Sequence, residues 1–169
     1  METLKAILTR RSIRKYINKN IPEEYYEIML KAAMHAPTAR NKQPWHFIII
    51  TDRTILGKLA AVSPSWKMLD EAASAIVVCG DRNLEDTESF IIQDCSAATQ
   101  NILLSAHELG LGTVWLGVHP REDRLVPLAK ILGIPENILP VSMISVGRPD
   151  EIREQPDRYN VERIHQDGW

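Results

Sequence analysis

The chain contains only two cysteines among its 169 residues, and it lacks long apolar runs. Cys79 and Cys95 form no Cys-x-x-Cys pair and have no cluster of histidines nearby, so the sequence indicates neither a disulfide framework nor a zinc site. Both are expected to be buried structural thiols. No stretch approaches the roughly 18 apolar residues that a membrane helix requires, and the N-terminus lacks the apolar core of a signal peptide. We therefore expect a cytoplasmic protein with no membrane partner.

Several signatures of self-contained catalysis are absent too. The sequence has no Gly-x-Gly-x-x-Gly after a predicted strand, no Walker loop, no nucleophile elbow and no His-Glu-x-x-His. Its five histidines are scattered along the chain. Without partners at ligand spacing, each is expected to be a packing or surface residue rather than a metal ligand. The sequence thus predicts no catalytic side chain and no metal.

The chain has no excess of positive charge, with 20 lysines and arginines against 22 acidic residues and a net charge of −2. This balance gives no broad basic surface and argues against nucleic acid as a partner. The exception is the segment Arg10–Lys15, which gathers three arginines, a lysine and Ser12. Guanidinium groups match pairs of phosphate oxygens, although such clusters are more often solvated surface. Taken alone, the segment leaves both interpretations open.

Hydrophobic patterning predicts one domain over residues 1–169 in which helices and strands are interleaved. Strands are predicted at 45–51, 75–80, 113–118 and 141–146, the first two being continuously apolar and therefore central in a sheet. Helices are predicted at 4–8, from near 22 to Pro37, and at 52–61, 87–109 and 123–132. The irregular strand–helix spacing favours an α+β fold with helices packed on a mixed sheet.

Two local features carry further expectations. Asn20 is a candidate cap for the second helix. The stretch Ser63-Pro64-Ser65-Trp66 has the composition of a loop and could overhang a site.

The helix predicted at 87–109 is apolar on most of its circumference. Ile91, Cys95 and Ala98 follow one another at steps of three or four, while Phe90 and Ile92 occupy other faces. A helix of this kind must be covered nearly all round, and a short chain has few elements to cover it. A second subunit could supply the cover.

Three more segments could contact a ligand. The loop 36–45 combines small residues with donors and acceptors suited to a flat ligand, although it could be a turn-rich connection only. Gly110 and Gly112 precede the strand that contains Leu116 and Gly117, and these glycines could merely end a helix. Arg148 follows the last predicted strand. Each of these signals is weak by itself.

In this order, the segments resemble the FMN-dependent nitroreductase family, and the chain is similar to its short, single-domain members. Arg10-Arg11-Ser12-Ile13-Arg14 resembles the family's phosphate- and ribityl-binding motif, and Pro37–Trp45 resembles its flavin-ring loop. The helix segment 94–101, with Gly110–Gly112 and Trp115–Gly117 after it, resembles the dimer helix and the ring-contacting strand. Gly147-Arg148-Pro149 matches a second phosphate arginine, and Arg163–His165 resembles the family's tail. The resemblance covers essentially the whole chain.

The resemblance implies an α+β fold with a largely antiparallel central sheet flanked by helices, in an intertwined homodimer with two flavin sites at the interface. The tail 150–169 would pack on the partner subunit. Residues implied in FMN binding are Arg10, Arg11, Ser12 and Arg148 at the phosphate; Arg14 near the ribityl chain or pyrimidine; Pro37, Thr38, Ala39, Asn41 and Gln43 at the ring, from the other subunit; and the backbone of Leu116 and Gly117 at its N5/O4 edge.

The activity implied by the resemblance is that of an FMN-dependent NAD(P)H oxidoreductase. NADH or NADPH would donate two electrons, and a nitroaromatic, quinone or similar small molecule would accept them in ping-pong turnover. A bound flavin carries out this chemistry itself, which accounts for the lack of a catalytic triad. The alternatives are a flavoprotein of the same fold with other chemistry, such as dehalogenation or flavin fragmentation, and a non-catalytic FMN-binding protein.

Overall fold

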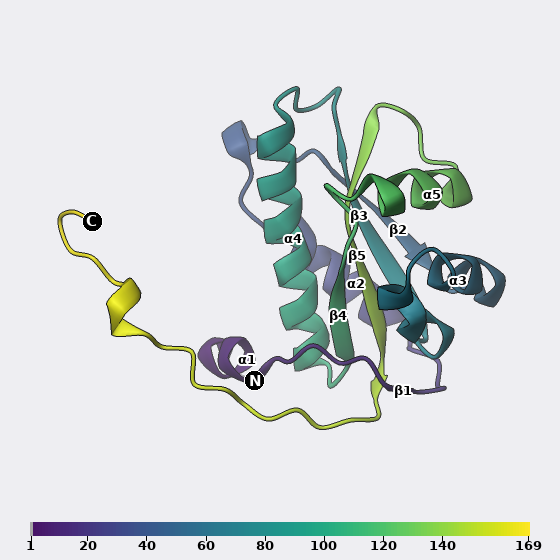
Figure 1. The fold of residues 1–169 in the computed structure, drawn as a ribbon, viewed down its shortest axis with the longest axis horizontal. Helices are drawn as coiled ribbons and strands as arrows, with labels where there is room; N and C mark the ends of the chain where they lie inside the picture. The colour runs from purple at the N-terminus through teal and green to yellow at the C-terminus, as the bar shows by residue number, and fades with distance from the viewer. Residues whose placement is uncertain (1) are drawn as a thin grey trace.

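The computed structural model describes residues 2–169 and shows one five-stranded sheet with helices on both faces (Figure 1). The strands are β1 (Tyr16–Ile17), β2 (Trp45–Ile50), β3 (Ser74–Asp81), β4 (Gly112–Gly117) and β5 (Ile138–Pro149). The helices are α1 (Thr3–Thr9), α2 (Glu23–Met34), α3 (Arg53–Ala60), α4 (Glu88–Glu108) and α5 (Glu122–Leu132), with 3₁₀ turns η1 (Ala39–Asn41), η2 (Pro64–Asp70) and η3 (Val161–Arg163).

Strand β5 organises the sheet, because it pairs with β3 along one edge and with β4 and β1 along the other. Strand β2 completes the order β1-β5-β3-β2. The prediction that 45–51 is a central strand is therefore wrong: β2 is an edge strand paired only with β3, and its middle residues are partly exposed. All four ladders are antiparallel, and a parallel bridge joins Ser12 to Thr113. The predicted α+β fold with a largely antiparallel sheet is confirmed.

Helices cover the two faces of the sheet in separate layers (Figure 1). On one face, α2 and α4 bury Met29, Ile91 and Ile102 against sheet residues such as Ile76 and Ile144. On the other face, α3, η2 and α5 enclose a second core that contains Leu56, Trp66, Val77, Leu128 and Met143. Alternation along each strand sends successive side chains into different cores, as the period of two requires.

A β-bulge interrupts this alternation where β3 meets β5. The register shifts between Val78 and Cys79, so that Val78 faces Ser142 and Cys79 faces Pro140, and Val141 is the extra residue. The bulge places both Val141 and Leu139 with Ile144 in the core on the face covered by α2 and α4. Proline has no N–H to donate, which suits a break in the ladder at this position.

Three local expectations are corrected. Pro22, and not Asn20, occupies the position before the first residue of α2. The stretch predicted as an overhanging loop forms η2, and Trp66 within it is fully buried. Strand β5 begins three residues earlier and ends three residues later than the predicted 141–146, because pairing with β3 and β1 extends it past Pro140 and Gly147.

The surface keeps several apolar side chains uncovered. Helix α1 leaves Leu4, Ile7 and Leu8 between 48% and 72% exposed, and Phe90 at the start of α4 is 38% exposed. The C-terminal arm, defined as residues 150–169, leaves the body after β5 and extends past α1 (Figure 1). Its Ile152 and Trp169 are fully exposed. Among residues 2–169, no helix has the length and apolarity needed to cross a bilayer.

Candidate functional site

The arginine segment Arg10–Arg14 lies against one end of the sheet. The Ile13 N–H donates to the Thr113 carbonyl at 2.9 Å, which ties the segment to the beginning of β4. Glycine permits this close approach, because a Cβ atom at Gly112 would lie 2.7 Å from Ile13 and one at Gly147 would lie 2.6 Å from Tyr16. The two glycines pair with each other across β4 and β5.

Five arginines surround a cavity of about 320 Å³ at this end of the sheet. The arginine segment contributes three of them and the C-terminal arm two; the lining residues are Arg10, Arg11, Ser12, Arg14, Arg153, Glu154, Pro156 and Arg158. The Arg11 Nε donates to the Glu154 carbonyl at 2.9 Å, which holds the arm beside the segment. The Glu151 carboxylate accepts the Arg14 N–H at 2.6 Å and pairs with Arg153 at 2.6 Å.

The electrostatics of this arginine-lined cavity favour an anion. Burial lowers the pKa of Arg10, and the charges of Arg11 and Arg158 lower it further. Arg148 follows Gly147 at the same end of β5, and its Nε is buried without a hydrogen-bond partner. A phosphate would relieve the repulsion and could accept from the unpaired donors. These residues therefore fit the phosphate of a cofactor such as FMN.

The predicted ring loop, residues 37–43, folds into the turn η1 at the opposite end of α4. The Ala39 N–H donates to both oxygens of Asp94 at 3.1 and 3.2 Å. The Gln43 N–H donates to the Thr38 hydroxyl at 3.3 Å, and the Gln43 side chain donates to Asn41 at 2.9 Å. Pro37, Asn41 and Gln43 are exposed, so the polar groups of this loop face outward.

Arg40, for which no role was predicted, binds the protein itself. Its Nη2 lies 2.9 Å from both oxygens of Glu85, whose side chain is fully buried. The Lys42 ammonium lies 3.4 Å from the same carboxylate. The Arg40 guanidinium also lies over the Phe90 ring, 5.6 Å from its centroid. Arg40 thus holds the ring loop against the start of α4.

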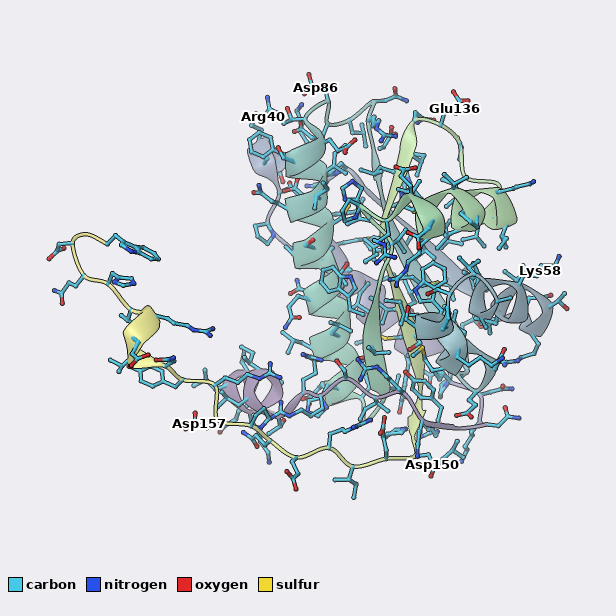
Figure 2. All side chains as sticks on the ribbon, in the orientation of Figure 1. Arg40, Lys58, Asp86, Glu136, Asp150 and Asp157 are labelled. Atoms are coloured by element: carbon cyan, nitrogen blue, oxygen red, sulfur yellow. The ribbon has the colours of Figure 1, made fainter. Side chains whose placement is uncertain are left out.

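The arginine-lined cavity and the ring loop lie far apart within one chain. Figure 2 shows Arg40 and Asp86 at one end of α4, and Asp150 and Asp157 on the arm near its other end. The Thr9 hydroxyl meets His107 at 2.8 Å, whereas the ring loop meets α4 at Asp94. The thirteen positions of helix from Asp94 to His107 correspond to a rise of about 20 Å.

The end of β4 lies between these two regions. The side chain of Leu116 is buried in the second core, which α3, η2 and α5 enclose, so only its backbone is available to a ligand. A Cβ atom at Gly117 would meet only the Arg124 Nη1, at 3.7 Å, which leaves open space above the backbone. The same Arg124 nitrogen donates to the Gly117 carbonyl at 3.0 Å.

The structure therefore gathers Arg10, Arg11, Ser12 and Arg14 at one cavity, with Arg148 on the adjacent strand end, and separates them from the ring-loop residues. Sequence reasoning missed Arg153 and Arg158, because the charges of the arm alternate without a recognisable motif. It also missed Glu85, Asp94 and Arg124, whose partners lie far away in the sequence.

Comparison with known proteins decides the family. The sequence pattern of the nitroreductase family matches residues 7–66 and 60–148. The chain belongs to the nitroreductase family. A curated nitroreductase relative from Archaeoglobus fulgidus, which carries the provisional name NADH dehydrogenase/NAD(P)H nitroreductase, is 51% identical over 172 residues, with 99% of each chain covered.

Solved structures of nitroreductases agree with the fold. A structure from Parabacteroides distasonis, with the same provisional name, is 42% identical, has a TM-score of 0.95 and is matched over 99% of this chain and 98% of that chain. A nitroreductase from Desulfovibrio desulfuricans, solved in complex with FMN, is 30% identical with a TM-score of 0.85, over 100% and 99% of the two chains.

Proposed function

We propose that this nitroreductase binds FMN and acts as an NAD(P)H oxidoreductase that passes two electrons to a small-molecule acceptor. The observation that carries the proposal is the cavity lined by five arginines, in which burial and the charges of Arg11 and Arg158 lower the pKa of Arg10. The FMN-bound nitroreductase relative and the flavin reductases among other relatives support the same cofactor.

The phosphate end of FMN would be held by Arg10, Arg11, Ser12 and Arg148. Arg14, Arg153 and Arg158 would add positive charge around it, the last two from the arm. Charge-assisted bonds from guanidinium groups are roughly twice as strong as neutral ones, and they give the site its preference for a phosphorylated flavin.

The bound flavin supplies the chemistry, taking two electrons from NADH or NADPH and giving them to an acceptor such as a nitroaromatic or quinone. The protein's task is to bind and orient. The backbone N–H groups of Leu116 and Gly117 would face the ring edge where negative charge develops, and Arg124 fixes the orientation of Gly117 through its carbonyl. Stabilisation of this kind requires donors that are already in place. Donor and acceptor would use one pocket in turn, which gives ping-pong kinetics.

The functional unit is proposed to be a homodimer. One chain places the arginine-lined cavity and the ring loop at opposite ends of α4, so Thr38, Ala39 and Asn41 of one subunit would serve the flavin bound by the other. The exposed apolar residues of α1 and the fully exposed Ile152 and Trp169 of the arm provide surface for the partner. Exposed apolar surface of this extent is typical of an interface.

The deciding experiment is the visible spectrum of the purified protein after addition of FMN and desalting. Retained flavin bands that NADH or NADPH bleaches without oxygen, and that a nitroaromatic restores, would support the proposal. Flavin that no nicotinamide reduces would indicate a binding protein instead. A colourless protein would refute the cofactor. Parallel steady-state plots for the two substrates are expected, and intersecting plots would refute ping-pong turnover.

A further inference from the structure

The ring loop contains three residues other than glycine in the left-handed region of backbone conformation. Arg40, Asn41 and Gln43 have φ angles of 54°, 55° and 50°. Residues with a Cβ atom adopt this conformation at a cost, and several of them persist together only where the surroundings impose it. The contacts that impose it are therefore informative about what the loop is for.

Two buried carboxylates supply those contacts. Asp94 is 5% exposed and accepts the Ala39 N–H with both oxygens, immediately before the left-handed residues. Glu85 is fully buried; it accepts from Arg40 at 2.9 Å and from the Thr87 N–H at 2.9 Å, and Lys42 lies 3.4 Å away. Together they hold the loop at Ala39, Arg40 and Lys42, that is, on both sides of Asn41.

This arrangement does not serve the hydrophobic core. The turn η1 contributes no buried residue, and the Arg40 side chain remains 58% exposed. Burying a carboxylate is costly unless it is paired, and here that cost secures a loop that buries little in return. A conformation maintained in this way suits a surface that must be ready for a ligand.

We propose that Glu85 and Asp94 are positioning residues that hold the ring loop in its flavin-binding conformation before FMN arrives. The inference rests on the proposed function. Neither carboxylate contacts the cofactor; they act through Arg40, Lys42 and the Ala39 N–H. A protein whose binding-competent loop is only partly populated binds with an affinity reduced by that fraction.

The test compares Glu85→Gln with the wild-type dimer. Glutamine keeps the size and can still accept from the Thr87 N–H, but it removes the charge that holds Arg40 and Lys42. We expect FMN to bind about tenfold more weakly in a fluorescence titration, because the loop must then be ordered on binding. Inorganic phosphate, measured by its competition with FMN, should bind with unchanged affinity, because it uses only the arginine-lined cavity. A general loss of structure would weaken both.

Glu88→Gln is the matched control, since it removes the same charge from the first turn of α4 but breaks an exposed pair with Arg82. It should bind FMN like the wild type. Arg40→Gln removes the Arg40–Glu85 ion pair by changing the exposed partner, Arg40. It therefore still tests the inference if Glu85→Gln fails to fold. Wild-type affinity in both Glu85→Gln and Arg40→Gln would overturn the inference, whereas a wild-type protein that binds no FMN would overturn the proposed function instead.

Discussion

The Arg124 Nη1 donates a hydrogen bond to the Gly117 carbonyl at 3.0 Å, which joins the first turn of α5 to the last residue of β4. The same guanidinium lies 6.0 Å from the centroid of the Trp66 ring. The side chain thus connects the strand end proposed to face the flavin with the core beneath it.

Arg124→Ala should lower the free energy of unfolding by about 1.5–3 kcal/mol, the usual loss for a hydrogen bond to a charged donor. Urea denaturation of the protein without FMN measures it. Arg121→Ala is the control, because Arg121 pairs only at the surface with Asp123, and such pairs contribute about 0–1 kcal/mol. An equal loss of unfolding free energy in the two variants would show that the contact with Gly117 stabilises the fold no more than a surface ion pair does.

Arg10→Ala should weaken FMN binding about ten- to hundredfold, because it removes a charge-assisted contact worth roughly 1.5–3 kcal/mol. Fluorescence titration measures the affinity. Lys67→Ala removes an exposed cation on η2 and should leave the affinity unchanged. If Arg10→Ala bound FMN as well as the wild type does, the phosphate site would lie elsewhere.

Two glycine substitutions should change stability in opposite directions. Gly147→Ala would bring a Cβ atom to 2.6 Å from the Tyr16 ring, and such overpacking typically costs about 1–3 kcal/mol. Gly57→Ala lies within α3 with no atom within 4 Å of the new Cβ, so it should gain about 0.5–1 kcal/mol from better helix propensity. Thermal unfolding of both variants distinguishes them; a stable Gly147→Ala would show that the arginine segment can move away from the sheet.

The loss of folding stability at acidic pH should come partly from Glu85. The Thr87 N–H lowers the pKa of this carboxyl most, and Arg40 and Lys42 add to the effect, so that it falls from 4.5 to about 2. Because the folded-state pKa is depressed, the stabilisation is present above the unfolded pKa and is lost as the pH falls from 4.5 towards 2. Glu85→Gln should therefore lose less stability than the wild type between about pH 5 and pH 3. Urea denaturation at the two pH values tests this, and identical losses would contradict it.

Much of the fold could be predicted because its signals are local. The apolar run at Ile76–Val78 marks β3, which is central and buried on both faces, and the periodicity of 87–109 marks α4 to within one residue at each end. The run at Phe47–Ile50 identifies β2 as a strand but not its place, because β2 lies at the sheet edge and Ile49 is 40% exposed. Cys79 and Cys95 are free and buried, as expected. In contrast, β1 has two residues and is created by its pairing with β5, which no local pattern reveals.

The site was predictable only in part, for a similar reason. The arginine segment is contiguous, so its grouping at one cavity follows from the sequence. Arg158 comes to the same cavity through the path of the arm, and Glu85 meets Arg40 across 45 positions. The charged composition around Glu85 resembles ordinary surface, and only its complete burial shows that it is part of the ring-loop support.

The central place of β5 also determines when the sheet can form during synthesis. This strand pairs with β1, β3 and β4, yet it occupies positions 138–149 of 169. Until it emerges, β4 and β1 have no partner in the sheet, and β2 and β3 can form only a two-stranded ladder, which is marginally stable in water. Pairings between distant positions also fold slowly. The chain must therefore keep its apolar strands from aggregating until it is nearly complete, and late-acting chaperones would have the greatest effect on its yield.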